Sequence, residues 1–296
     1  MATVVLGERD LEILEALEKW GVLGLAQLDG LAFKKQAPEQ ERIRLLFNET
    51  DRKMYTLAAY KRLRDLELAG YIKGHFYLNH PKVFTLTERG HKTLLQERRA
   101  RVQGFKRGIS ESLLTHELTV NGVGLILSQL LCLKVRSEFE LATQWAQKDR
   151  RKSPTRYVTP DIWIMPGSVL PEDPVTVEIE LTQKAEARYK KLWEHYVRVL
   201  PYGTLVLYLT SWPGGVKCIL ELTSKYGAQG GGYLVYVASL QSFQETGGRC
   251  IFTNHAHYDP RYLRLAPPRP AAPAPAIQPA AIAPPASSPV PGAPQA

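Results

Sequence analysis

Two short β-like runs with acidic side chains limit most strongly what this chain can fold into. Residues 157–165 carry Asp161 directly after Pro160, and residues 175–181 carry Glu178 and Glu180. Because side chains alternate between the two faces of a strand, Glu178 and Glu180 point the same way. If the two strands are adjacent, both glutamates join Asp161 at one edge of a sheet. Carboxylates gathered in this way hold divalent cations for phosphodiester chemistry.

Each of these acidic residues also has a purely structural interpretation. Asp161 would be the first residue of a turn, although strands disfavour Asp and burying an unpaired carboxylate is costly. Glu178 and Glu180 would lie on the solvated face of an edge strand. The chemical interpretation expects Asp161 and Glu178 to hold Mg²⁺ or Mn²⁺, with Glu180 or Lys184 orienting the attacking water. The sequence leaves both interpretations open.

Length and composition set the outer limits. A chain of 296 residues is long enough for two domains with cores of their own. No apolar run approaches the roughly 18 residues that span a bilayer, and the first residues lack the pattern of a signal peptide. Three scattered cysteines indicate reduced thiols. We therefore expect a cytoplasmic protein without a membrane partner, and the formal net charge of +9 favours a polyanionic one.

The last segment, residues 266–296, consists almost entirely of Pro, Ala and other small residues, and Arg269 is its only charged side chain. Such a segment buries too little apolar surface to offset the entropy that ordering costs. We predict a disordered, partly polyproline tail, and the alternative is a tether that docks a partner.

Residues 8–100 show the pattern of a helix-rich unit. Apolar spacing predicts helices from residue 8 to Gly21, over 23–33 and over 54–69, the last one capped by Gly70. The charged stretch 34–53 is either a loop or an inserted helix. Two β-like runs, 71–77 and 82–86, form a hairpin signal, and Thr87 opens another helix that extends to about residue 101.

Three helices, a β-ribbon and a further helix follow one another in the order of a winged helix-turn-helix, whose third helix enters the major groove of DNA. The outward side of the third helix offers side chains suited to phosphate and base-edge contacts. These are Lys53, Tyr55, Thr56, Tyr60, Lys61, Arg62 and Arg64. The alternative is that the charged residues are only the solvated face of an amphipathic helix.

The second half has the pattern of an α/β sandwich with a mixed sheet. A long helix over 109–131 precedes β-like runs at 133–141, 157–165 and 175–181, then a helix over 184–200 and β-like runs at 204–210 and 233–238. A basic loop between the first two runs would neutralise a phosphate backbone beside the acidic cluster. Its residues are Lys148, Arg150, Arg151, Lys152 and Arg156.

Several other residues are weaker candidates. Glu138 and Glu140 lie on the first predicted strand and would face the site. His116, on the long helix, is more typical of a hydrogen-bonded group than of a ligand. The helical stripe of Tyr189, Trp193 and Tyr196 is more typical of core packing than of a platform for bases. His255 and His257 have ligand-like spacing, but the partner pattern of a zinc site is missing.

The second half resembles the PD-(D/E)xK nuclease-like superfamily. Pro160-Asp161 matches the start of the family's first signature strand, and Glu178 matches the acidic residue of the second. Glu180 stands where the family usually has lysine, and Lys184, at the start of the next predicted helix, would supply a nearby ammonium. The resemblance implies an α/β nuclease-like domain and a divalent-metal-dependent DNA endonuclease or nickase.

The order of elements over about residues 8–240 resembles the replication-relaxation family of plasmid and mobile-element proteins. The resemblance rests on residues 60–72 and 83–90, His116-Glu117-Leu118, Pro160-Asp161, residues 177–182, Tyr189, Lys191-Leu192 and Tyr196. It implies a role in plasmid replication and DNA relaxation, with double-stranded DNA as partner. A homodimer, and replication or mobilisation proteins, are the further partners that it suggests.

The expected fold is therefore α+β. Residues 1–108 form a winged helix-turn-helix DNA-binding domain, residues 109–265 form the nuclease-like α/β domain, and residues 266–296 form the tail. The expected function is DNA binding of the plasmid replication and DNA-relaxation type, and the sequence leaves open whether the second domain also nicks or cleaves DNA with a divalent metal. The alternative is a non-catalytic replication accessory factor or transcriptional regulator, whose second domain serves dimerisation or grips the DNA.

Overall fold

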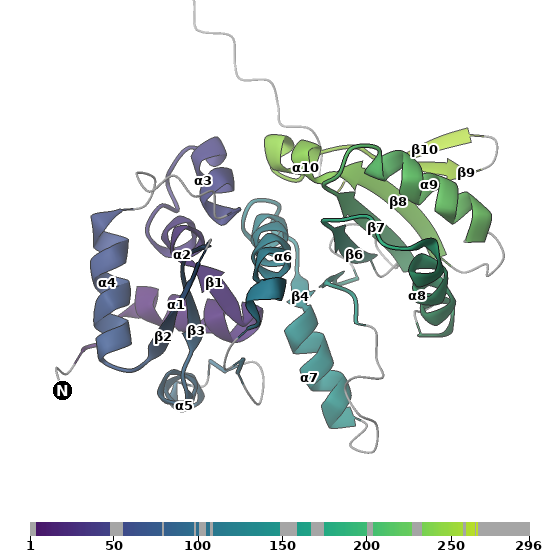
Figure 1. The fold of residues 1–296 in the computed structure, drawn as a ribbon. Coiled ribbons are helices and arrows are strands. Elements are labelled where there is room, and N and C mark those ends of the chain that lie inside the picture. Colours follow the sequence, from purple (N-terminus) through teal and green to yellow (C-terminus); the bar gives the residue numbers. More distant parts are fainter. Residues whose placement is uncertain are drawn as a thin grey trace, which may run out of the picture.

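A computed structural model gives the fold of most of the chain (Figure 1). It describes residues 4–47, 56–78, 80–97, 99–100, 105–106, 109–148, 159–166, 175–199, 204–226, 233–256, 259–263 and 265. Within these ranges the chain forms ten helices and two β-sheets. The mixed α+β class expected from the sequence is confirmed.

The first sheet is small and antiparallel, with the strand order β1-β3-β2. Its strand β1 was not expected, because the sequence predicted a helix from residue 23. Val22 and Leu23 pair with Thr85 and Phe84 instead, and a strand of three residues is too short to show a period. The elements of this half are α1 (Glu8–Trp20), β1 (Val22–Gly24), α2 (Leu25–Ala32), α3 (Glu39–Leu46), α4 (Leu57–Leu68), β2 (Ile72–Tyr77), β3 (His80–Leu86) and α5 (Glu88–Gln96).

Helix α4 is fixed at both ends by its own sequence. The hydroxyl of Thr56 accepts the N–H of Ala59 as an N-cap. Asp29, buried in α2, accepts both the backbone N–H and the hydroxyl of Thr56 at 2.9 and 2.8 Å, which locks α4 to α2. Gly70 takes a φ of +77° just after the helix, as the predicted cap requires. The stretch 34–53, left open by the sequence, contains helix α3.

The second sheet has seven strands in the order β10-β9-β8-β7-β6-β5-β4. Strands β6, β7 and β8 run parallel to one another, and the other pairs are antiparallel, so the predicted mixed sheet is confirmed. Its elements are α6 (Glu111–Gln129), β4 (Val135–Ser137), α7 (Glu138–Lys148), β5 (Ile162–Ile164), β6 (Val175–Glu180), α8 (Glu186–Val199), β7 (Thr204–Thr210), α9 (Gly215–Tyr226), β8 (Tyr233–Ser239), α10 (Leu240–Thr246), β9 (Phe252–Ala256) and β10 (Asp259–Leu263).

The prediction of a strand over 133–141 is wrong beyond Ser137. Ser137 and Glu140 form a capping box: the hydroxyl of Ser137 accepts the N–H of Glu140, and the Glu140 carboxylate accepts the N–H of Ser137. This local pair starts helix α7, so Glu138 and Glu140 lie in its first turn and not on a strand. The Ser-x-x-Glu spacing was the signal that the period-2 reading overlooked.

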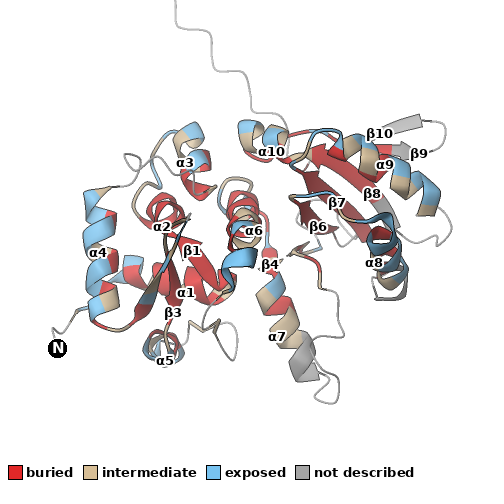
Figure 2. Cartoon of the chain, viewed as in Figure 1, coloured by how far each residue is buried: buried red, intermediate tan, exposed pale blue. Residues whose placement is uncertain are grey.

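Helix α6 lies between the two sheets, and α8 and α9 cover the far face of the larger one (Figure 1). One apolar core runs from α1 across α6 to β5, β6 and β7, and Figure 2 shows β6 and β7 as buried. Gly124 of α6 makes the close approach, since a Cβ there would lie 2.0 Å from the indole of Trp20. Asn121 ties α6 to the first half by donating to the carbonyls of Trp20 and Val22 at 3.2 and 2.5 Å.

A second apolar core lies under α8 and α9. It contains the predicted aromatic stripe of Tyr189, Trp193 and Tyr196, all of which are fully buried. The core-packing interpretation of this stripe is therefore confirmed. In the described part of the chain, no helix combines the length and the apolar character that crossing a membrane requires.

Candidate functional site

The predicted acidic residues meet where strand β5 begins beside β6. Ile162, the first residue of β5, pairs with Val177 in antiparallel register, which brings the preceding residue, Asp161, next to Glu178 and Ile179. Strand β6 lies inside the sheet, between β5 and β7, and all six of its residues are buried. The alternative of a solvated edge strand for the two glutamates is therefore wrong.

Asp161 and His116 complete the hydrogen bonding of Ile179, just beyond the end of the β5–β6 ladder. The backbone N–H of Ile179 donates to Asp161 Oδ2 at 2.7 Å, and His116 Nε2 donates to the carbonyl of Ile179 at 3.0 Å. His116 Nε2 also lies 3.7 Å from Asp161 Oδ2. Asp161 and His116 thus hold the strand together as well as facing each other.

The two glutamates have partners on helix α8 and on the turn before it. The hydroxyl of Tyr196 donates a short hydrogen bond to Glu178 Oε1. Lys184 Nζ lies 2.5 Å from Glu180 Oε1. The ammonium of Lys184, considered from the sequence as a nearby cation, therefore forms an ion pair with Glu180.

Burial of these carboxylates changes their proton affinity. Burial, with added repulsion from Glu138 and Glu180, raises the pKa of Asp161 to about 7, against the opposing effects of His116 and of the Ile179 N–H. Burial and the neighbouring Asp161 raise the pKa of Glu178 well above its usual range. Burial also raises the pKa of Glu180, although Lys184 counteracts it. Three carboxylates thus lie close together in a buried position, where burial and their mutual repulsion favour the protonated forms.

The donor atoms of Asp161 and Glu178 are of the type that Mg²⁺ and Mn²⁺ prefer. Among the described residues, however, no three His, Cys, Asp or Glu side chains are assembled into a group that could hold a metal ion. Each of the three acidic side chains is instead turned to a partner within the protein. A metal at this place would require the carboxylates to exchange those partners for the ion.

A small cavity of about 180 Å³ opens on the α6 side of the cluster, lined among others by Lys106, His116, Glu117 and Glu138. Lys106 Nζ pairs with Glu117 Oε1 at 2.6 Å. Burial, followed by repulsion from Glu117, raises the pKa of Glu138. Glu138 and His116, weaker candidates from the sequence, both lie next to Asp161.

The side chains predicted for DNA binding on α4 divide into two groups. Tyr60, Lys61 and Arg64 are exposed on the outer face of the helix. Arg62 instead forms a two-point ion pair with buried Asp10, with Nε–Oδ1 at 2.8 Å and Nη2–Oδ2 at 2.6 Å. Thr56 is the N-cap of α4, and its hydroxyl is bonded to Asp29 and to the N–H of Ala59. Lys53 and Tyr55 lie outside the described residues.

Only the first residue of the predicted basic loop, Lys148, lies within the described residues. Lys148 is the last residue of helix α7, which was not predicted. Arg150, Arg151, Lys152 and Arg156 lie outside the described residues, as do His257 and the tail 266–296. Whether these cations approach the acidic cluster stays a prediction.

Comparison with known proteins adds no family to these observations. Neither a protein family model, nor a curated protein, nor a solved structure matches this chain.

Proposed function

We propose that this chain is a double-stranded DNA-binding protein of the plasmid replication and DNA-relaxation type. The observation that carries the proposal is the outer face of α4, where Tyr60, Lys61 and Arg64 are exposed next to an antiparallel ribbon. The resemblance to the replication-relaxation family supplies the biological setting. A homodimer and replication or mobilisation proteins are proposed as further partners on the same ground.

The arrangement of the first half supports a winged helix-turn-helix. Helices α1, α2 and α4 pack around β1-β3-β2, and the β2–β3 ribbon follows α4 directly along the chain. In this class of domain the third helix of the motif enters the major groove and the ribbon contacts the backbone. The inserted helix α3 packs against α6 and leaves α4 uncovered on its outer side.

The side chains around α4 have the chemistry that DNA contacts need. Lys61 and Arg64 offer positive charge for phosphates, and the guanidinium of Arg64 can also donate two bonds to a guanine edge. Exposed Lys73 on β2 adds a cation to the ribbon. Tyr60 and Arg64, with Lys82 and Phe84 of β3, line a small cavity of about 200 Å³ between α4 and the ribbon.

Charge reversal tests this proposal. Binding of a fluorescent duplex to the full chain is measured by anisotropy for the wild type, for Lys61→Glu with Arg64→Glu, and for Lys92→Glu. Lys92, exposed on α5, is the matched control. We expect the double variant to lose at least tenfold in affinity and the control to lose little. Equal affinities of the double variant and the control would refute binding through α4.

A second candidate function is metal-dependent nicking or cleavage of DNA at the acidic cluster. The specific observation in its favour is the register that brings Asp161 next to Glu178, with Glu180 and Lys184 alongside. In this proposal Asp161 and Glu178 would hold Mg²⁺ or Mn²⁺, which would supply Lewis-acid chemistry at the scissile phosphate.

Metal binding and cleavage are measured separately for the second candidate. Addition of Mn²⁺ should raise the thermal midpoint of the wild type but not that of Asp161→Asn. Supercoiled DNA should be nicked by the wild type and left intact by Asp161→Asn, while both bind duplex equally. If the wild type neither gains stability with Mn²⁺ nor nicks DNA, the non-catalytic DNA-binding alternative holds.

A further inference from the structure

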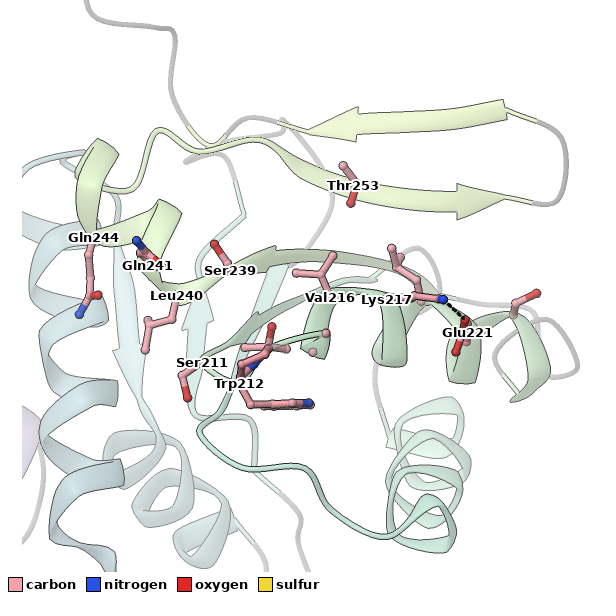
Figure 3. A pocket seen from close by; sticks show the side chains of 16 residues that line it. Ser211, Trp212, Val216, Lys217, Glu221, Ser239, Leu240, Gln241, Gln244 and Thr253 are labelled. Atoms are coloured by element: carbon pink, nitrogen blue, oxygen red, sulfur yellow. Dashed lines mark ion pairs between the residues drawn. The ribbon is translucent and has the colours of Figure 1, made fainter.

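A large cavity lies at the carboxyl ends of the parallel strands β7 and β8 (Figure 3). Its lining includes no residue of α4 and none of Asp161, Glu178 and Glu180. Its volume is about 1110 Å³. Its walls come from the 211–214 loop, the start of α9, helix α10 and Thr253 of β9. Ligands of open α/β sheets commonly bind at this end of the strands.

Thr210, the last residue of β7, brings an unused polar group to this cavity. Its side chain is only 2% exposed, and its Oγ1 has no hydrogen-bond partner among the described residues. Gly215, the first residue of α9, faces it closely, because a Cβ at this position would lie 2.7 Å from Thr210 Oγ1. A buried hydroxyl without a partner is destabilising, so this group points to a hydrogen bond that a ligand completes.

The start of α9 offers a place for an anion. The turn before the helix uses a φ of +75° at Gly214, and the first intrahelical bond runs from Cys218 N to Gly214 O at 2.9 Å. The N–H groups of Val216 and Lys217 precede that bond, so they are directed out of the helix end, where the helix dipole attracts negative charge. The Lys217 ammonium adds charge and is only loosely paired with Glu221, at 3.7 Å and in an exposed position.

The remaining walls suit a flat heteroaromatic group. The indole of Trp212 lies on one side of the cavity and Leu240 on the other (Figure 3). Gln241 and Gln244 of α10 add side-chain amides that can both donate and accept hydrogen bonds. An aromatic face next to amide groups is the setting in which bases stack and are recognised along their edges.

We propose that this cavity binds a nucleoside phosphate, with its base against Trp212 and its phosphate at the start of α9 near Lys217 and the Thr210 hydroxyl. Two sources share this chemistry: a free nucleotide, and the 5′-phosphorylated end of a single DNA strand. The proposal is independent of DNA binding through α4, because no residue of α4 lines the cavity.

The test uses the full chain and isothermal titration calorimetry. The probes are dAMP, a 5′-phosphorylated hexanucleotide and the same hexanucleotide without the phosphate. Trp212→Ala and Thr210→Val are compared with the control Thr223→Val. Thr223 lies on α9 outside the cavity lining, and its hydroxyl donates to the carbonyl of Ile219 at 2.7 Å. We expect Trp212→Ala and Thr210→Val each to weaken binding about tenfold and the control to leave it unchanged.

The probes separate the two sources of the ligand. Equal affinity for dAMP and for the phosphorylated strand identifies a nucleotide site, and at least tenfold tighter binding of the phosphorylated strand identifies a strand-end site. Thr210→Val should unfold at a urea midpoint no lower than that of the wild type, because it removes a buried hydroxyl that has no hydrogen-bond partner within the described protein. Absence of binding at millimolar probe, or binding that both variants leave unchanged, would overturn the proposal. Duplex binding through α4 is unaffected by either result.

Discussion

Replacing Asp161 by Asn should change how the stability of the protein depends on pH. The pKa of Asp161 rises from 3.8 to about 7 on folding, mainly through burial. Between these values the folded state keeps a proton that the unfolded state has lost. The contribution of Asp161 to stability is therefore full below pH 3.8 and is lost as the pH rises to about 7.

The size of this effect follows from the width of the window. About three pH units, at 1.36 kcal/mol per unit, give a loss of about 4 kcal/mol at most for the wild type. Asn carries no titrating proton but keeps an oxygen that can accept the N–H of Ile179. Asp161→Asn should therefore match the wild type below about pH 4, and the excess of its unfolding free energy should grow by about 2–3 kcal/mol between pH 5 and pH 8.

Urea unfolding followed by circular dichroism at pH 5, 6, 7 and 8 measures both proteins under the same conditions. Glu221→Gln is the control, since Glu221 is an exposed carboxylate on α9 and its loss should leave the pH dependence unchanged. The reasoning is refuted if Asp161→Asn and the wild type lose stability with pH at the same rate. In that event Asp161 is not the buried, proton-binding carboxylate described above.

Three further variants test the packing and the ion pairs. Arg62→Ala removes the ion pair that joins α4 to α1 and should lower the unfolding free energy by about 1–3 kcal/mol in urea, with little change in duplex affinity. Tyr196→Phe leaves Glu178 without its hydroxyl donor and should cost about 1–3 kcal/mol at pH 7, also measured in urea. Gly124→Ala forces a Cβ against the indole of α1 and should lower the thermal midpoint, since overpacking costs about 1–3 kcal/mol. A midpoint equal to that of the wild type would contradict the close contact of α6 with α1.

Long periodic elements were predictable from the sequence, because their patterns are set locally. The helix over 109–131, the parallel strands β6 and β7, and the hairpin between β2 and β3 follow from apolar periodicity and turn residues. Strand β1 was not predictable in this way, because its three residues form a strand only by pairing with β3. Helix α7 was not predicted, because residues 133–141 alternate between polar and apolar side chains as a strand does. The Ser137–Glu140 capping box starts a helix within this stretch instead.

The acidic cluster was predictable as a juxtaposition but not in its bonding. Alternation along β6 places Glu178 and Glu180 on one side, and the pairing of β5 with β6 brings Asp161 to them. That Tyr196 and Lys184 would bind these carboxylates depends on how α8 packs, which no local pattern specifies. The same holds for Arg62, whose ion pair with Asp10 depends on the angle between α1 and α4.

The salt dependence of duplex binding tests the central claim most directly. Dissociation constants are measured between 50 and 200 mM salt, as a rough working range, for the wild type and for the double variant Lys61→Ala, Arg64→Ala. If both side chains contact phosphates, the double variant should bind more weakly. The slope of its log affinity against log salt should be less steep than that of the wild type by about 2. An unchanged slope and affinity would contradict the proposal that α4 is the DNA-binding helix of this protein.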